Sequence, residues 1–344
     1  MKSIKITVCL FCAVLFTLNC KSKEIQKKDA QSKLKALIID GESGHGIWPK
    51  STFMIKSYLE ETGLFDVDVA RKKYLWIGPH HNKVEETDDI KELLNIYPFE
   101  DGIERIVLDS TRYDPSFSPD FKKYDVIVNN LGWKSSEWPK DTKQRFEDYM
   151  KNGGGLVIVH SANNAWGQWE EYNKMIGLGG WGGRTIESGP YVYFNKNDEL
   201  IKDPAEGPCA THGPQHNYIV KTRAPEHPIM KGLPKEWLHN KDELYERMRG
   251  PAENMTILAT AYSDSKHGKR MTDRHEPLLM TIEYGKGRTF HTALGHMDYS
   301  MECAGFITTL QRGAEWAATG EVTQAIPEDF PTTENTSIRK WRLN

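Results

Sequence analysis

The chain has little excess of charge of either sign. Its 344 residues include 45 lysines and arginines and 48 aspartates and glutamates, which gives a formal net charge of −3. Domains that bind nucleic acid normally carry a marked excess of basic residues. We therefore expect no nucleic-acid partner, and the length suits one large domain or two small ones.

Cysteine is also scarce, and most of it lies near the N-terminus. Three of the five cysteines fall within the first twenty residues, so Cys209 and Cys303 remain for the folded part. Outside the cytoplasm these two thiols can form a disulfide, and two unpaired thiols are an equal alternative. Neither a cysteine nor a clean Gly-x-Ser-x-Gly pattern accompanies the apolar stretch 156–159, which leaves no obvious nucleophile there.

The N-terminal apolar run covers thirteen residues, 6–18, and is too short to cross a bilayer comfortably. Lysines precede it and Cys20 follows it, which predicts a signal peptide over 1–19 and a lipid on Cys20. Asn19 departs from the Gly, Ala or Ser usual at that position. We expect an exported cell-envelope lipoprotein, periplasmic or outer-membrane associated, with the membrane contact made through Cys20; simple secretion is the alternative. Residues 20–33 are predicted to form a flexible tether.

Strand and helix patterns alternate in the first half of the chain. Continuous apolar strands between amphipathic helices indicate a parallel sheet covered on both faces. Residues 71–102 are charged and poorly periodic, so we expect a surface insertion there. The expected strands are 34–40, 67–70, 104–109, 124–130 and 156–159, and the expected helices are 52–63 and 140–154.

The second half has more strand character and one clear hairpin. Gly-Lys-Gly at 285–287 joins two strands, and a closing helix ends at Gly320. We expect one domain over 34–320 and a surface tail over 321–344. The expected strands are 191–194, 218–221, 256–262, 277–285 and 288–294.

Histidines follow several of the predicted strands. Ligands of open α/β sheets bind beyond the carboxyl ends of the strands. We therefore expect residues 40–48, 129–133 and 160–166 to lie around one crevice. Imidazole can serve as general acid, general base or metal ligand. Hydrogen-bonded structural histidines are the alternative. The candidate catalytic histidines are His45, His160 and His296.

A second histidine pair suggests a metal. His212 and His216 lie four residues apart, but Gly213-Pro214 between them prevents a regular helix, so convergence on a metal needs a further ligand from elsewhere. Several histidines without a cysteine cluster favour zinc or a similar divalent ion. We expect no nucleotide cofactor. The candidates for the further ligand are His160, Asp242, Glu243 and His275.

Several motifs together resemble the ThuA-like family, which is named for trehalose utilisation. They are GGGLVIVHSANNAW (153–166), EHPIMKGLP (226–234), DELY (242–245), YGKGRTFHTALGH (284–296) and EWAATG (315–320). Three further stretches resemble a bacterial lipoprotein subgroup: THGPQHNY (211–218), MRGPAENM (248–255) and TDRHEPLL (272–279). The resemblance implies a class I glutamine amidotransferase-like fold, a three-layer flavodoxin-like parallel sheet with helices on both faces, here with an added β-hairpin.

The same resemblance implies what the site does and does not contain. In amidotransferases, the strand corresponding to 156–159 ends in an elbow that carries a nucleophilic cysteine. Here the elbow reads VHSAN, so amidotransferase activity is not expected. Ser161 lacks the flanking glycines of a nucleophile elbow, which disfavours serine catalysis. The resemblance implies that Asp242 or Glu243 faces the site, and of the two we prefer Glu243 as the catalytic residue.

Substrate contacts are expected from aromatic and polar residues around the crevice. Indole faces stack on sugar rings, although core packing is an equal alternative for each tryptophan. Arg249 can bind substrate oxygens or pair with surface acids. The expected substrate-binding residues are Trp48, Trp133, Asn163, Trp166 and Arg249.

The resemblance implies carbohydrate metabolism, often beside sugar oxidoreductases that make 3-keto-glycosides. We therefore expect an envelope enzyme that acts on an oxidised sugar or glycoside by acid/base, and if a metal is present metal-assisted, elimination, isomerisation or hydration. A non-catalytic sugar-binding lipoprotein and a metal-dependent hydrolase of unoxidised substrates are the alternatives. The sequence leaves the oligomeric state open.

Overall fold

A computed structural model describes residues 32–343, except 81–83 and 85. The predicted signal peptide, Cys20 and nearly all of the predicted tether lie outside these residues. The chain from Lys33 onwards forms one compact unit. Within the described ranges, no helix is long and apolar enough to cross a membrane.

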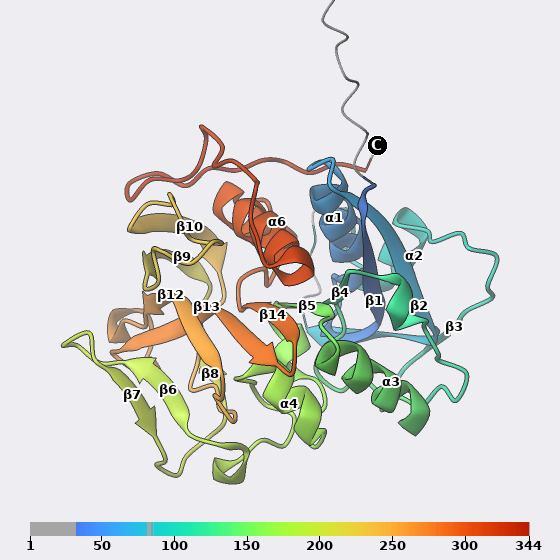
Figure 1. Ribbon diagram of the computed structural model, residues 1–344, viewed down its shortest axis with the longest axis horizontal. Coiled ribbons are helices and arrows are strands. Elements are labelled where there is room, and N and C mark those ends of the chain that lie inside the picture. The colour runs from blue at the N-terminus through green and yellow to red at the C-terminus, as the bar shows by residue number, and fades with distance from the viewer. Residues whose placement is uncertain (1–31, 81–83, 85, 344) are drawn as a thin grey trace, which may run out of the picture. The chain divides into compact units, whose positions relative to one another are not determined.

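A twelve-stranded sheet in the described part of the chain has one half in which every pair of neighbours is parallel (Figure 1). The order in this half is β14-β5-β4-β1-β2-β3. The carboxyl ends of these strands therefore meet at one edge. The bounds are β1 Leu34–His45, β2 Phe65–His80, β3 Ile106–Leu108, β4 Val126–Asn129, β5 Gly155–Val159 and β14 Gly287–Thr292.

The other half of the sheet is antiparallel and continues from β14 in the order β13-β12-β9-β10. The predicted hairpin is present as β13–β14 and joins the two halves. The expected α/β class is confirmed, but the antiparallel part is much larger than a single added hairpin. Its strands are β9 His216–Thr222, β10 Glu236–Asp242, β12 Met255–Tyr262 and β13 His275–Tyr284, with β6 Tyr191–Phe194 paired to β13 and β7 Leu200–Asp203 paired to β6. A separate pair consists of β8 Thr211–His212 and β11 Tyr245–Glu246.

Helices cover both faces of the parallel half (Figure 1). Side chains alternate along a strand. In β1, Ala36 and Ile38 pack in one apolar cluster with α1 and α6, while Leu37 and Ile39 pack in a second cluster with α3 and α4. The bounds are α1 Trp48–Glu60, α2 Leu93–Ile96, α3 Lys140–Lys151, α4 Glu170–Ile176, α5 Asp298–Met301 and α6 Ala304–Thr319, and the short 3-10 helices are η1 Ile90–Glu92, η2 Phe121–Lys123, η3 His160–Asn164, η4 Ile186–Ser188 and η5 Ser265–His267.

The prediction of a surface insertion from residue 71 is wrong at its start, because β2 continues to His80. Arg71 and Lys72 are buried against carboxylates of β1: Arg71 Nη2 lies 2.6 Å from Asp40 Oδ2, and Lys72 Nζ lies 2.6 Å from Glu42 Oε2. Charges neutralised in this way can occupy a buried strand. They interrupt the apolar pattern that the prediction relied on.

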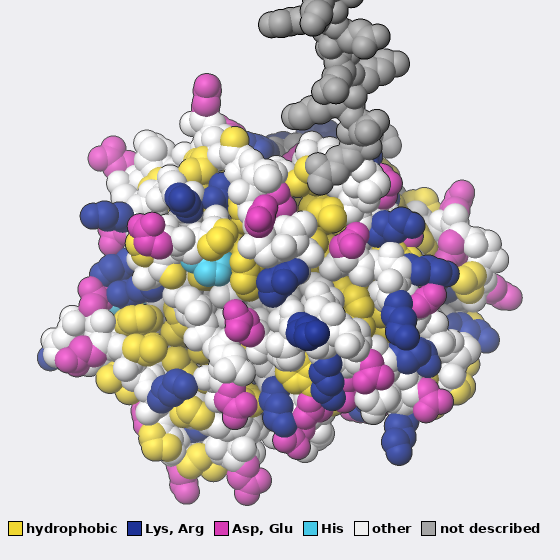
Figure 2. All heavy atoms as spheres, in the orientation of Figure 1, with side chains coloured by type: hydrophobic (Ala, Val, Ile, Leu, Met, Phe, Trp, Pro, Cys, Tyr) yellow, Lys and Arg dark blue, Asp and Glu magenta, His cyan; other side chains and the backbone are white. Residues whose placement is uncertain are grey.

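The C-terminal tail after α6 is part of the compact unit and packs against the rest of it. The amide of Leu238 in β10 donates to the Thr332 carbonyl at 2.7 Å, and the amide of Ala304 donates to the Ser337 carbonyl at 2.9 Å. Cys209 and Cys303 are both free thiols, so the alternative of two unpaired cysteines holds. On the face shown in Figure 2, basic and acidic side chains are interspersed.

Candidate functional site

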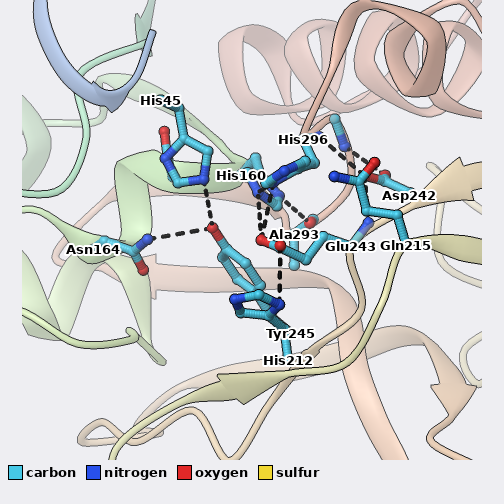
Figure 3. Close-up of polar contacts among 12 residues, drawn as sticks. His45, His160, Asn164, His212, Gln215, Asp242, Glu243, Tyr245, Ala293 and His296 are labelled. Atoms are coloured by element: carbon cyan, nitrogen blue, oxygen red, sulfur yellow. Dashed lines mark hydrogen bonds and ion pairs between the residues drawn. The ribbon is translucent and has the colours of Figure 1, made fainter. Parts of the chain in front are cut away.

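The structure brings the three candidate catalytic histidines together at the carboxyl edge of the parallel strands (Figure 3). His45 ends β1, His160 follows β5, and His296 comes shortly after β14. The ring centroid of His45 lies 5.2 Å from that of His160 and 5.0 Å from that of His296. The ring centroids of His160 and His296 are 5.0 Å apart. The expectation that strand ends share one crevice is therefore correct for these residues.

His160 occupies a constrained position at the turn from β5 into η3. Its φ of 43° lies in the left-handed region, which side chains other than glycine adopt at a cost and often at functional sites. Its Nδ1 lies 2.7 Å from the Ala293 carbonyl, which can only accept, so Nδ1 carries the proton. Nε2 then presents a lone pair 2.9 Å from His296 Nδ1. Burial, reinforced by His296, lowers the pKa of His160 to about 4 and keeps the ring neutral.

Glu243 bridges two imidazoles. Its Oε2 lies 2.9 Å from His296 Nδ1, and its Oε1 lies 3.0 Å from His212 Nδ1. Burial alone would raise the pKa of this carboxyl, but the contacts with both imidazoles outweigh burial and hold its pKa far below the usual range. Hydrogen bonding to Glu243 in turn raises the pKa of His212.

Asp242 fixes the backbone that carries the site residues. Its carboxylate accepts from the amides of Gly295 at 2.8 Å, His296 at 3.0 Å and Glu243 at 2.8 Å. It also lies 2.8 Å from His239 Nε2. With all of these partners, Asp242 is fully buried and positions the site, whereas Glu243, the residue preferred from the sequence, faces it.

A cavity of about 310 Å³ opens above these side chains. The Tyr245 hydroxyl lies 3.4 Å from His45 Nε2 and accepts from Asn164 Nδ2 at 3.3 Å. Trp181 packs against Tyr245, with ring centroids 4.9 Å apart. The residues that line the cavity are His45, Trp133, Asn164, Trp181, His212, Glu243, Tyr245 and His296.

Three of these lining residues were not identified from the sequence: Asn164, Trp181 and Tyr245. Two of them lie inside motifs that carry the family resemblance, Asn164 in HSANNAW and Tyr245 in DELY. That membership was the available signal. Trp181 lies between glycines in GGWGG, without a strand or helix pattern that would have placed it.

Two of the expected sugar-stacking tryptophans lie in the core, which corrects the prediction. Trp48 is buried against Leu75 and Ile77, and its indole N–H donates to the Trp76 carbonyl at 3.0 Å. Trp166 packs in the apolar cluster under α3 and α4, and its N–H donates to the Ser136 carbonyl at 3.1 Å. Both lie near the predicted strand ends, but their rings point into protein.

The polar predictions also need correction. Asn163 is fully buried, with Nδ2 3.0 Å from His291 Nε2. Arg249 is fully buried over the Tyr191 ring at 3.5 Å and donates to the Gly189 and Ala205 carbonyls. Each side chain is committed to protein partners and lies away from the cavity.

The predicted metal pair His212 and His216 does not converge. His216 Nδ1 lies 2.7 Å from the Pro214 carbonyl, and its ring stacks on His267 with centroids 3.9 Å apart. Gly213-Pro214 separates β8 from β9, so the two histidines belong to different sheets. The group whose ligand atoms do lie close together consists of His45, His160, Glu243 and His296.

Fold and pocket together define a mixed α/β protein with a histidine-rich cavity at its parallel strand ends. The ThuA family model, described as trehalose utilisation, matches residues 74–317. A crystal structure of a ThuA-like protein from Parabacteroides merdae is 41% identical, covers 90% of this chain and 98% of its own, and superposes with a TM-score of 0.74. The chain belongs to the ThuA family.

A second ThuA-like crystal structure, from Bacteroides uniformis, is 18% identical over 86% of this chain and 95% of its own, with a TM-score of 0.50. At that identity it shows a shared fold alone. No curated protein sequence matches the chain.

Proposed function

We propose that the cavity is the active site of an enzyme that acts on an oxidised (3-keto) sugar or glycoside. The observation that carries the proposal is a carboxylate held between two imidazoles, with a third imidazole and a phenol on the same cavity wall. The cavity volume of about 310 Å³ suits a small ligand. The family description, trehalose utilisation, agrees with a carbohydrate substrate.

The chemistry suited to these groups is proton transfer next to a ketone. In a 3-keto-glycoside, a base removes the acidic proton on C2, and the C2–H electron pair forms the C1–C2 double bond. The C1–O bond breaks as an acid protonates the departing oxygen, which releases an alcohol and an unsaturated ketone. Addition of water to the double bond is the hydration step. If instead the C1–O bond stays intact and the C2–H pair is held as the enolate of the ketone, return of a proton to the opposite face of C2 is isomerisation. General acid and base groups each contribute about 100- to 10,000-fold to such steps.

The lining residues divide these roles. His45, His212, Glu243, Tyr245 and His296 face the cavity and can exchange protons with a bound sugar. His160 lies beneath them and acts through its contact with His296. Trp133 and Trp181 are the indoles placed to stack on a sugar ring.

The test is a panel of 3-keto-glycosides and the matching unoxidised glycosides and esters, with products identified by mass spectrometry, with and without a chelator. We expect turnover of keto substrates alone. Cleavage of unoxidised substrates would support the alternative of a metal-dependent hydrolase. Binding without turnover, lost in Trp133→Ala but retained in His45→Asn, would support a non-catalytic sugar-binding lipoprotein.

We also propose that the chain is exported and anchored in the cell envelope through a lipid on Cys20. Metabolic labelling with a palmitate analogue should label the wild-type chain and leave Cys20→Ser unlabelled.

The finer fold assignment, to the class I glutamine amidotransferase-like group, rests on the constrained His160 after β5, where an amidotransferase has its cysteine. Without that thiol, we propose no amidotransferase activity.

A further inference from the structure

Four side chains converge at the floor of the cavity with potential metal-ligand atoms turned toward one another. One ligand atom of each lies within 4.8 Å of the corresponding atom of every other. Three of the four are buried. They are His45, His160, Glu243 and His296.

The lone pairs at the centre of this group outnumber the protons. His160 Nε2 must present a lone pair, because the Ala293 carbonyl fixes the proton on Nδ1. That lone pair lies 2.9 Å from His296 Nδ1 and 3.9 Å from Glu243 Oε2, and His296 Nδ1 lies 2.9 Å from the same oxygen. A single proton on His296 Nδ1 would be shared between two acceptors. A cation placed among the three atoms is attracted by all of them.

We infer that these four side chains form a binding site for one divalent transition-metal ion. Imidazole nitrogens with one carboxylate oxygen form a ligand set that suits zinc and its neighbours rather than magnesium or calcium. The inference deepens the proposed function by naming a cofactor of the same cavity. Metal binding itself is measured without any sugar.

The residues around the ligands have the arrangement that metal sites commonly show. A metal-bound histidine usually donates its other ring N–H to a carbonyl or carboxylate, as His160 does to Ala293. Asp242 holds the amides of both Glu243 and His296, so two of the ligands are fixed through one buried carboxylate. The second oxygen of Glu243 contacts His212, which orients the carboxylate. The ligands are thus held in place before an ion arrives.

The cavity gives the ion an open side. His45, Glu243 and His296 line both this floor and the cavity, whereas His160 closes the site from below. A ligand oxygen from the cavity would be the fifth ligand of an ion in this position, a coordination number that catalytic zinc sites can reach and closed structural sites do not. The pair predicted from the sequence, His212 and His216, contributes only an orienting residue.

The test uses the full chain, stripped with a chelator and then incubated separately with Zn²⁺, Mn²⁺, Fe²⁺, Co²⁺ and Ni²⁺. Elemental analysis after desalting should find about one ion per chain for at least one of these metals. The Co²⁺ form should show visible absorption typical of nitrogen and oxygen ligands. Less than one-tenth of an ion per chain with every metal would overturn the inference.

Variants identify the ligands. Glu243→Gln and His160→Asn should each weaken binding by about 100-fold or more, beyond the 10- to 100-fold typical of residues that only orient ligands. Asparagine is chosen for position 160 because it tolerates positive φ. His216→Asn is the matched control and should bind as the wild type does. Equal binding by all three variants would overturn the assignment.

The two proposals fail separately. A loaded ion without turnover of any sugar supports the metal site and counts against the proposed function. Turnover of keto sugars by a chain that binds no metal supports the proposed function and overturns the metal site. Circular dichroism on each variant checks folding, and Glu243→Asp, which retains a carboxylate, should recover part of the affinity lost in Glu243→Gln.

Discussion

The two halves of the sheet contribute to the cavity in different ways. The parallel half supplies His45, His160 and His296 from the carboxyl ends of β1, β5 and β14. The antiparallel half supplies Glu243, just after β10, and the separate two-stranded sheet of β8 and β11 supplies His212. Parallel strands bring their ends to one edge whatever the rest of the chain does. The partners from the other half arrive through pairings that no local pattern reveals.

The histidines from the parallel half and from the small sheet also differ in burial. The His160 side chain is 3% exposed and the His212 side chain is 43% exposed. The parallel half therefore provides a buried floor, and the small sheet contributes a partly exposed side chain to the wall of the cavity. Glu243 follows a strand of the antiparallel half and contacts His296 from the parallel half and His212 from the small sheet, so it connects all three. The predictions below test this division, in order of decreasing effect.

The largest effect should come from removing the contacts of Glu243 with His212 and His296. Glu243→Gln removes the carboxylate charge that holds both imidazoles, and kcat/KM for a keto-glycoside should fall by about 100- to 10,000-fold. Steady-state kinetics on purified protein measures the loss. The control is Glu283→Gln, a change at an exposed position of β13 that should leave kcat/KM unchanged. A fall of less than tenfold in Glu243→Gln would show that the link does not matter for turnover.

Asp242→Asn should mainly affect stability. The change leaves His239 and three amides facing a neutral side chain in a fully buried position. Removing one partner of a buried ion pair typically costs about 3–5 kcal/mol, so the free energy of unfolding should fall by that amount. Urea denaturation measures it, with the exposed Asp88→Asn as control. Unchanged stability would mean that Asp242 does not anchor the site.

Two histidines four residues apart should respond differently. His212→Asn removes a partner that orients Glu243, and kcat/KM should fall by about 10- to 100-fold. His216→Asn alters only a stack on His267 and should leave kcat/KM unchanged. Equal losses in both variants would contradict the separation of these residues into different sheets.

The smallest effect concerns substrate affinity. Aromatic stacking contributes about 0.5–1.5 kcal/mol, so Trp133→Ala should raise KM by about two- to tenfold with little change in kcat. Trp48→Phe should leave KM unchanged and lower stability, because Trp48 packs in the core. A raised KM in Trp48→Phe together with an unchanged KM in Trp133→Ala would show that Trp48, and not Trp133, contacts the substrate.

Sequence patterns were sufficient where local periodicity decides the structure. The β13–β14 hairpin, α6 with Gly320 at its C-cap, and the meeting of His45, His160 and His296 follow from strand ends and glycine turns. The missed elements depend on distant partners. Arg71 and Lys72 extend β2 because carboxylates of β1 neutralise them. In β10, the two apolar residues, Trp237 and Leu238, are adjacent and the other residues are polar or charged, so its pairing with β9 rather than a local pattern decides the structure.

Side-chain direction was the second limit. The sequence placed Trp48, Trp133 and Trp166 near strand ends, but which ring faces the cavity depends on packing against residues far along the chain. Trp48 turns toward β2 and Trp166 toward Trp138, while Trp133 lines the cavity. Trp181, which also lines the cavity, follows no periodic segment. Strand ends thus indicate the edge of the site and leave its walls undetermined.

A double-mutant cycle on zinc affinity tests the central claim most directly, with His160→Asn from the parallel half and Glu243→Gln from the antiparallel half. If one ion is bound by both halves, the two losses should be coupled by about 0.5–3 kcal/mol. Losses that add to within about 0.3 kcal/mol would contradict a shared site. Failure of the wild-type chain to bind zinc or any other divalent transition metal would contradict it as well.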